Sequence, residues 1–237
     1  MIVGEGGILI KNIISVLMKN NLGNIKECRT LVKHKKVMVN GMCLDSFDYI
    51  VNEDDRIFVD GIMINANPFI YYLLNKPKGY LSASYDQYDL CVTDLIDCDD
   101  CHCIGRLDRD TTGLLLLTND KSLSKRLLLP NRHIKKIYEV KTRKDIDPSL
   151  IEKFKEGVII DKIVKCKEAI LEIVNDRCCN VTLYEGKYHQ IKKMFLSCDN
   201  EVIALKRIAF SKIRLDSSLK EGEFRKLTKD EIKILYR

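Results

Sequence analysis

Residues 105–118 read Gly-Arg-Leu-Asp-Arg-Asp-Thr-Thr-Gly-Leu-Leu-Leu-Leu-Thr and join a polar loop to a run of four leucines. The loop, residues 105–113, holds two arginines, two aspartates and two glycines. The leucine run that follows predicts a buried strand, which would hold the loop rigidly at a surface. The loop by itself fits two interpretations, a catalytic site or an arginine-rich turn in which the aspartates only cap turns.

On either side of this segment the sequence predicts strands and short helices that do not alternate regularly as in βαβ units. Asn119 or Asp120 can cap one helix, Asp147-Pro148 opens another, and Thr228 with Glu231 forms a capping box for the last. The sequence therefore predicts an α+β fold with a mainly antiparallel mixed sheet flanked by helices. The expected strands are 69–74, 114–118, 134–142, 181–184 and 202–213, and the expected helices are 120–129, 148–156, 189–197 and a C-terminal helix.

The first sixty residues form a pattern of their own. Asn24 can cap a helix over 25–34, in which Ile25, Cys28, Leu31 and Val32 would share one face. Short strands over 37–39 and 56–59 follow, with Asn40-Gly41 as a hairpin turn between them. Residues 61–69 are rich in turn formers and look like a linker. We expect domains over 1–62 and 70–237, joined by a linker over 63–69.

Length and charge limit the class of protein. The 237 residues carry 40 Lys and Arg against 34 Asp and Glu, a net charge of +6, with 46% hydrophobic residues. Since a membrane helix needs about 20 apolar residues in a row, none is expected. The first nine residues lack the basic start of a secretory signal, so we expect a cytoplasmic protein without a membrane partner. The basic excess is compatible with a nucleic-acid partner.

The basic residues are concentrated in two places. Residues 19–36 hold six basic side chains against one acidic, and residues 121–144 hold nine against one. The first cluster would be either a polyanion-binding helix or a solvated amphipathic one. The second is a candidate phosphate-binding stripe.

Ten cysteines are many for this length. Without an export signal we interpret them as reduced thiols, many of them buried. Cys91, Cys98, Cys101 and Cys103 lie near His102, but no second spaced pair follows them, so we expect no metal site.

A third segment of interest is Glu185-Gly-Lys-Tyr-His-Gln-Ile-Lys-Lys-Met-Phe195. Ile191, Met194 and Phe195 form the apolar face of a helix, whereas Lys192 lies elsewhere. Lys192 would be a surface charge or a cation paired with a carboxylate of the 105–113 loop.

Together these segments resemble the pseudouridine synthases of the ribosomal small-subunit type. Gly105-Arg-Leu-Asp108 is similar to their catalytic motif, Asn75-Lys-Pro-Lys-Gly79 to their first strand and turn, Lys136-Ile-Tyr138 to their tyrosine motif, and 185–195 to their late helix. The N-terminal helix with Val37-Met-Val-Asn-Gly41 is similar to an S4 RNA-binding module. The start of that module departs from the usual pattern at Ile8-Leu-Ile-Lys-Asn12, and Lys192 stands where many relatives have arginine.

The resemblance implies an isomerase that converts a uridine of RNA to pseudouridine without cofactor or metal. It implies that Asp108 is the catalytic carboxylate, that Lys192 pairs with it, and that Tyr138 lies against the uracil. Asp110 would be structural and bond turn amides. The substrate-binding residues would be Arg106, which fills the space of the flipped nucleotide, Leu107 and Ile191 as apolar walls, Lys136 and Gln190.

The S4-like domain would contact phosphates through Lys26, Arg29, Lys33, Lys35 and Lys36. The small-subunit branch is favoured by Asp110-Thr-Thr-Gly113 and Lys187-Tyr-His-Gln190. It implies uridine 516 in the 530-loop helix of 16S ribosomal RNA, free or in an assembling subunit, as the target of a monomeric enzyme. The alternatives are the same reaction on 23S RNA, an S4-type binding protein without activity, or a glycosidase using Asp108 and Asp110.

Overall fold

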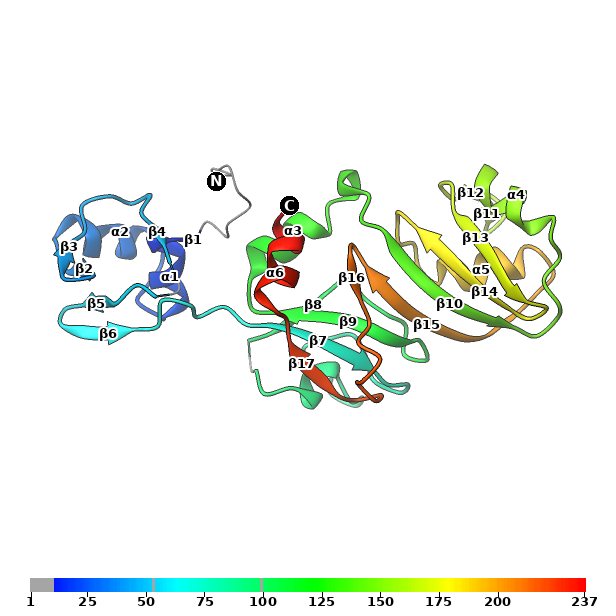
Figure 1. The fold of residues 1–237 in the computed structure, drawn as a ribbon, viewed down its shortest axis with the longest axis horizontal. Helices are drawn as coiled ribbons and strands as arrows, with labels where there is room; N and C mark the ends of the chain where they lie inside the picture. The colour runs from blue at the N-terminus through cyan, green and yellow to red at the C-terminus, as the bar shows by residue number, and fades with distance from the viewer. Residues whose placement is uncertain (1–10, 53, 99) are drawn as a thin grey trace. The chain divides into compact units, whose positions relative to one another are not determined.

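A computed structural model describes residues 11–52, 54–98 and 100–237 (Figure 1). The described chain divides into a smaller N-terminal unit, which ends at Phe69, and a larger unit over Ile70–Leu235. Each unit has its own core of buried apolar side chains. Residues 8–10 of the atypical Ile8–Asn12 start lie outside the described residues.

The smaller unit is a pair of helices with a four-stranded antiparallel sheet of order β3-β2-β5-β6. Ile13 and Leu17 of the first helix and Cys28 and Val32 of the second are buried in its core. Its elements are β1 (Lys11–Asn12), α1 (Ile13–Lys19), α2 (Ile25–Lys33), β2 (Val37–Val39), β3 (Met42–Cys43), β4 (Ile50–Val51), β5 (Ile57–Val59) and β6 (Ile62–Ile64), with β1 paired to β4.

Helix α2 begins where its capping residues predict. The Asn24 side chain accepts hydrogen bonds from the amides of Lys26 and Glu27, and the Glu27 carboxylate accepts one from the Asn24 amide. The predicted apolar face is wrong at one position, because Ile25 is 51% exposed. Ile25 is the first residue of the helix, and the buried face starts one turn later at Cys28.

The small sheet contains two hairpin turns, whereas the sequence predicts one. Asn40-Gly41 and Asp60-Gly61 both have positive φ angles, which suits the tight turns that join antiparallel strands. The second turn leads into β6, which pairs with β5 along its whole length. The prediction of a linker from residue 63 was therefore wrong for residues 63 and 64, which are strand.

The larger unit is built on a mixed, mainly antiparallel sheet of order β13-β14-β10-β15-β9-β7-β17. The one parallel pair within that order joins β9 to β15. Further short strands pair with it, β8 with β9 and β16 with β15. The strands are β7 (Tyr71–Lys76), β8 (His102–Ile104), β9 (Thr112–Thr118), β10 (Lys136–Thr142), β13 (Ile170–Asn175), β14 (Cys178–Leu183), β15 (Val202–Phe210), β16 (Ile213–Arg214) and β17 (Phe224–Lys226).

Helices are distributed along this sheet, as Figure 1 shows. The helix α4 packs on β13, α5 packs on β15, and α3 packs on β8. The helices are α3 (Lys121–Leu127), capped by Asp120, α4 (Leu150–Glu156), α5 (Gln190–Leu196) and α6 (Lys229–Tyr236), with the predicted capping box of Thr228 and Glu231. Two 3-10 turns, Val92–Leu95 and Pro130–Arg132, and a β11 (Ile159–Ile160) and β12 (Val164–Lys165) hairpin complete the unit.

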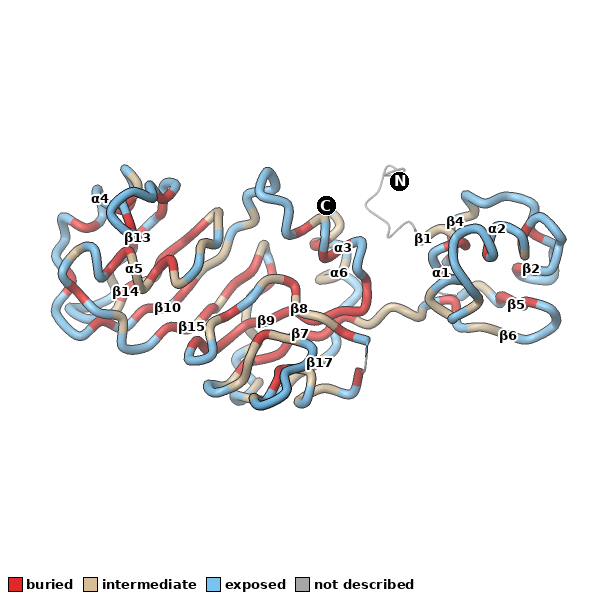
Figure 2. The backbone as a smooth tube through the Cα atoms, turned by 180° about the vertical axis from the view of Figure 1, so that it is seen from behind, coloured by how far each residue is buried: buried red, intermediate tan, exposed pale blue. Residues whose placement is uncertain are grey.

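The leucine run lies at the centre of the sheet. All seven residues of β9 are buried, and Figure 2 shows the buried stretches of β7 and β9 side by side. The strand starts at Thr112, two residues earlier than predicted, because β9 is paired with β15 already at Thr112 and Gly113. A Cβ at Gly113 would overlap the carbonyl oxygen of Arg207 and lie 2.9 Å from its amide nitrogen. The polar loop is therefore fixed directly to the sheet.

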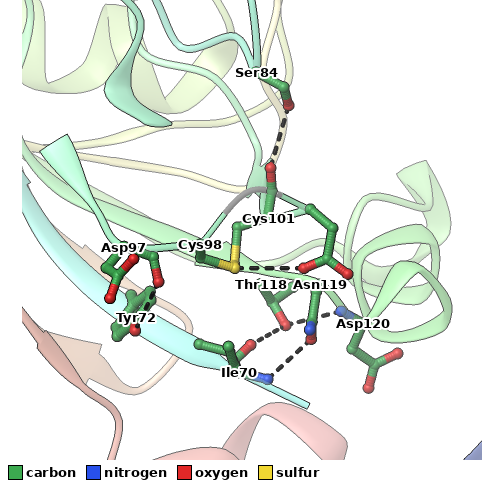
Figure 3. Close-up of a disulfide and its surroundings, with 10 residues drawn as sticks. Ile70, Tyr72, Ser84, Asp97, Cys98, Cys101, Thr118, Asn119 and Asp120 are labelled. Atoms are coloured by element: carbon green, nitrogen blue, oxygen red, sulfur yellow. Dashed lines mark hydrogen bonds between the residues drawn. A yellow bond between two sulfur atoms is a disulfide. The ribbon is translucent and has the colours of Figure 1, made fainter. Parts of the chain in front are cut away.

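Cys98 and Cys101 form a disulfide (Figure 3). The expectation of ten reduced thiols was wrong for this pair, because the turn between the two residues brings their Cα atoms to 5.5 Å. The Asp100 carboxylate lies near both sulfur atoms, but sulfur atoms joined to each other are not thiolate ligands. Among the described residues, no helix is both long and apolar enough to cross a membrane.

Candidate active site

The loop between β8 and β9 carries Asp108, and hydrogen bonds on both sides hold it in place. The Ser82 hydroxyl donates to the carbonyl oxygen of Leu107 at 2.8 Å and accepts from the Leu107 amide at 3.0 Å. The amide of Gly79 donates to the carbonyl oxygen of Arg109 at 2.8 Å. The residues before and after Asp108 are thus each tied to the segment that follows β7.

Arg109 adds a further link between the same two segments. Its Nε donates to the Gly79 carbonyl at 3.1 Å, and its guanidinium contacts the Asp89 carboxylate at 2.8 Å. Both side chains of this ion pair are partly exposed, so the pair adds little stability by itself. Its effect is to fix the direction in which the loop leaves the sheet.

Lys76 lies beneath the loop and is fully buried. Its ammonium donates to three carbonyl oxygens, those of Pro77 at 2.9 Å, Arg109 at 3.2 Å and Thr111 at 3.0 Å. Three donors therefore meet three acceptors, which satisfies a buried ammonium. Burial lowers the pKa of Lys76 to about 8, although the nearby Asp110 and Asp108 act to raise it.

Lys192 of α5 reaches the loop from the other side and contacts two carboxylates. Its Nζ lies 3.2 Å from Oδ2 of Asp108 and 2.5 Å from Oδ1 of Asp110. Partial burial would lower the pKa of Lys192, but the hydrogen bonds to Asp110 and Asp108 outweigh it and raise the pKa. Likewise burial would raise the pKa of Asp110, but the Lys192 ammonium holds it below its usual range. Opposite charge therefore favours the ionised forms of Lys192 and Asp110.

The two carboxylates differ in their surroundings. The side chain of Asp108 is 26% exposed, whereas that of Asp110 is 68% exposed. Asp110 was expected to bond turn amides, but its main partner is the Lys192 ammonium. Asp108 is the carboxylate that is both fixed and partly sheltered, which suits a group that reacts with a substrate covering it.

Leu107, directly before Asp108, belongs to the apolar core of the larger unit. Leu107, Tyr138 and Ile191 are each less than 10% exposed and belong to the same buried cluster. They come from the loop, from β10 and from α5 respectively. Lys192 thus contacts Asp108, and the sheet register pairs Tyr138 with Arg207, whose partner on the other side is Gly113 at the end of the loop.

Gln190 was expected to bind substrate, and the structure gives it a different position. Its side chain is buried, its amide nitrogen donates to Glu185 at 2.8 Å, and its amide oxygen accepts from the Lys187 backbone at 2.9 Å. Both ends of the amide are used inside the 185–190 loop. Gln190 orders the start of α5, and so determines where Lys192 points.

Arg106 and Lys136 differ in exposure. Arg106 is exposed and available to a ligand, as expected. Lys136 is half-buried, donates to the Ile134 carbonyl at 3.0 Å, and lies over the Phe210 ring. Burial, followed by the charge of Arg207, lowers the pKa of Lys136 to about 8. Lys136 can still meet a phosphate, but it must give up the Ile134 contact to do so.

The predicted phosphate contacts of the smaller unit lie at its surface. Lys26, Arg29 and Lys33 are exposed on α2, and Lys35 is exposed in the turn that follows. Lys36 pairs with Asp60 at 3.1 Å. Four of the five side chains can therefore approach a polyanion without breaking an ion pair shown by the described residues.

Sequence reasoning missed two residues of the site, Lys76 and His189. The signal for Lys76 was a lysine at the end of an apolar strand and directly before a proline. His189 approaches Asp108, with Nε2 3.6 Å from Oδ1. It adopts a left-handed backbone conformation, φ 53°, which no pattern in the sequence marks.

The chain is similar to known proteins over most of its length. The profile of the RNA pseudouridylate synthase family matches residues 70–197. An uncharacterized RNA pseudouridine synthase of Bacillus subtilis, YtzG, is 37% identical over 229 residues, covering 93% of this chain and 96% of that protein. Ribosomal small subunit pseudouridine synthase A of Pseudomonas aeruginosa is 37% identical over 213 residues, with coverage of 87% and 92%. A solved pseudouridylate synthase shares 30% identity with a TM-score of 0.68, covering 94% of this chain and 99% of that one.

Proposed function

Because the chain belongs to the RNA pseudouridylate synthase family, and so isomerises uridine in RNA to pseudouridine, we propose that its substrate is ribosomal RNA and that Asp108 is its catalytic carboxylate. The observation that carries this assignment is the Asp108–Lys192 contact of 3.2 Å, between two residues that directly follow the buried Leu107 and Ile191 in the chain. A fixed, ionised carboxylate beside an apolar surface suits a reaction on a flipped base.

The proposed reaction is an isomerisation in which the atoms of the uridine are kept. The bond between N1 of uracil and C1′ of ribose breaks, the uracil turns, and C5 bonds to C1′. The proton that C5 loses is replaced by the one that N1 gains, so no oxidant, phosphate donor or metal is required. Asp108 acts on the sugar or the base as nucleophile or base, and Lys192 keeps it ionised and aimed.

The neighbours of Asp108 have distinct proposed roles. Tyr138 lies against the uracil, and Leu107 and Ile191 exclude water from the bound base. Arg106, exposed two residues before Asp108, fills the space that the flipped nucleotide leaves in the RNA. Lys136 contacts a phosphate near the target.

The small subunit is the proposed source of the substrate. The Pseudomonas aeruginosa relative acts, by its name, on the small subunit, and it matches this chain at 37% identity. We extend this to uridine 516 of the 530-loop helix in 16S RNA, in free RNA or in an assembling subunit. The smaller unit acts as an S4-like module whose phosphate contacts give affinity without sequence choice. The enzyme works as a cytoplasmic monomer in this proposal.

The deciding experiment is carbodiimide mapping of pseudouridine in unmodified small-subunit and large-subunit RNA and in assembly intermediates. Each is treated with the wild-type protein and with Asp108→Asn, which keeps the shape of the side chain and removes its charge. We expect a new reverse-transcription stop in the 530 loop with the wild type and no such stop with the variant. The RNA affinities of the two proteins should differ by less than about twofold, a small free-energy change.

Other outcomes separate the parts of the proposal. A stop in large-subunit RNA keeps the chemistry and overturns the target. Residual turnover by Asp108→Asn overturns the role of Asp108. A wild-type protein that binds every RNA and modifies none contradicts ribosomal RNA as the substrate.

A further inference from the structure

An exposed aromatic stack borders the active site and has no part in the roles described above. The rings of Tyr188 and His189 lie 3.8 Å apart between centroids and 18° from parallel. Tyr188 is 73% exposed. Among the described residues its ring contacts are with His189 and Lys193, and its hydroxyl has no hydrogen-bond partner.

The stack is joined to the reacting group through His189. The imidazole Nε2 lies 3.6 Å from Oδ1 of Asp108, while its ring face supports Tyr188. The left-handed backbone at His189, φ 53°, is uncommon for a residue with a side chain. The imidazole therefore links the exposed tyrosine ring to the Asp108 carboxylate.

Packing in the core does not explain why a tyrosine stands at position 188. Tyr71, Tyr72 and Tyr138 are each less than 10% exposed and help to form the core, whereas Tyr188 keeps most of its surface in water. An exposed ring contributes little to folding. Lys193 lies 5.2 Å from the Tyr188 centroid, and its ammonium is paired with Asp161 at 2.6 Å. An exposed aromatic face is the surface on which the base of an unpaired nucleotide stacks.

We propose that the Tyr188–His189 stack is a binding platform for the base of an unpaired nucleotide adjacent to the target uridine. The stacked base anchors the strand beside Asp108, while the uridine itself lies at the Asp108 carboxylate. The platform accepts any base, because every base presents a flat face. The proposal rests on the RNA substrate of the proposed function and assigns it a second contact point.

The test compares three substitutions at one position. Tyr188→Phe keeps the ring and removes the hydroxyl, while Tyr188→Leu and Tyr188→Ala remove the ring. We expect the phenylalanine variant to bind RNA as the wild type does, and the leucine and alanine variants to bind about tenfold more weakly. The single-turnover rate at saturating RNA should change by less than about twofold, which corresponds to under 0.5 kcal/mol. Leu196→Ala, which shortens an exposed side chain at the last residue of α5, is the control expected to change neither value.

A second measurement identifies the stacked nucleotide. The three nucleotides on either side of the target are replaced one at a time by an abasic residue in a 530-loop RNA, and binding is measured with the wild type and with Tyr188→Leu. One abasic position should weaken wild-type binding about tenfold and leave the binding of Tyr188→Leu unchanged.

Two results would overturn the platform. One is binding by Tyr188→Leu and Tyr188→Ala that equals the wild type. The other is an abasic penalty of the same size in both proteins at every position. If the wild type forms no pseudouridine in this RNA, the target is wrong, but the binding comparison still decides the role of Tyr188, since it requires no turnover.

Discussion

Lys192 contacts two carboxylates that have unequal access to solvent, and this sharing defines its role. We expect Lys192→Met to lower the single-turnover rate at neutral pH by about a hundredfold or more, because Asp108 then loses the ammonium that lies 3.2 Å from its carboxylate. RNA affinity should fall by less than about fivefold, about 1 kcal/mol.

Lys192→Arg is the matched control for that prediction. Its guanidinium keeps the charge and can bridge both carboxylates, so the variant should retain most of the rate. A rate that Lys192→Met leaves unchanged would remove Lys192 from the site. The measurement is single-turnover conversion of labelled RNA by each protein.

Lys76 makes stability depend on pH in a direction that can be checked. Its pKa is about 8 in the folded protein and about 10.4 in an unfolded chain. Between these values the unfolded chain binds more protons, so the contribution of Lys76 to the free energy of unfolding rises with pH. Below about pH 8 the ammonium is charged in both states and its contribution is constant.

The measurement is urea unfolding of the wild type and Lys76→Met at several pH values. Groups common to both proteins cancel in the difference. The difference should favour the wild type increasingly from pH 8 to 10, by up to about 1.4 kcal/mol per pH unit. A flat difference over that range would show that Lys76 keeps its ordinary pKa.

Single residues were predictable from the sequence where a motif carried them. Asp108, Tyr138 and Lys192 were identified by resemblance, and the structure puts Lys192 in contact with Asp108. The approach of His189 to Asp108 joins segments far apart in the chain, so no short-range pattern could predict it. The Cys98–Cys101 disulfide and the Gln190 hydrogen bonds are local, but they depend on the backbone conformation of their turns, which the residue types alone do not determine.

At the scale of elements, Gly113 fixes the catalytic loop to the sheet. We expect Gly113→Ala to destabilise the protein by about 3 kcal/mol or more, because its Cβ would overlap the Arg207 backbone and its φ of 99° disfavours any side chain. Thermal unfolding checks this. Gly186→Ala is the control, since a Cβ there meets no atom within 4 Å, and its melting temperature should stay close to that of the wild type.

The predicted helix starts agree with the structure where a capping residue marks them, whereas the predictions at the edge of the small sheet agree less well. Asn24, Asp120 and Thr228 begin helices as predicted, because capping is a local interaction. The strand β6 was mistaken for a linker, since Ile62–Ile64 has turn-forming neighbours on both sides. Its strand state depends on pairing with β5, which a local pattern does not reveal.

At the scale of the whole molecule, the basic surface of α2 should control the salt dependence of RNA binding. Replacing Lys26, Arg29 and Lys33 together by alanine removes three exposed charges. We expect the slope of log K against log salt to become shallower by about 2, since each phosphate contact contributes roughly 0.7–0.9.

The control for that prediction replaces Lys153, Lys155 and Lys165 by alanine. These three lysines are exposed in the larger unit, away from α2 in the chain. This control changes the net charge by the same amount and should leave the slope nearly unchanged. Equal effects from the two triple variants would mean that overall charge, and not the α2 surface, governs binding. Fluorescence anisotropy across a series of salt concentrations provides both slopes.

The parallel pairing of β9 with β15 has a consequence for synthesis of the protein. Thr112 and Gly113 cannot reach their partners, Lys206 and Arg207, until nearly the whole chain has left the ribosome. Contacts so distant along the chain close slowly, and the start of β9 lacks these partners in the meantime, although β7 and β8 can already pair with its leucines. Chaperone binding during translation should therefore begin after β9 emerges and end once β15 is complete.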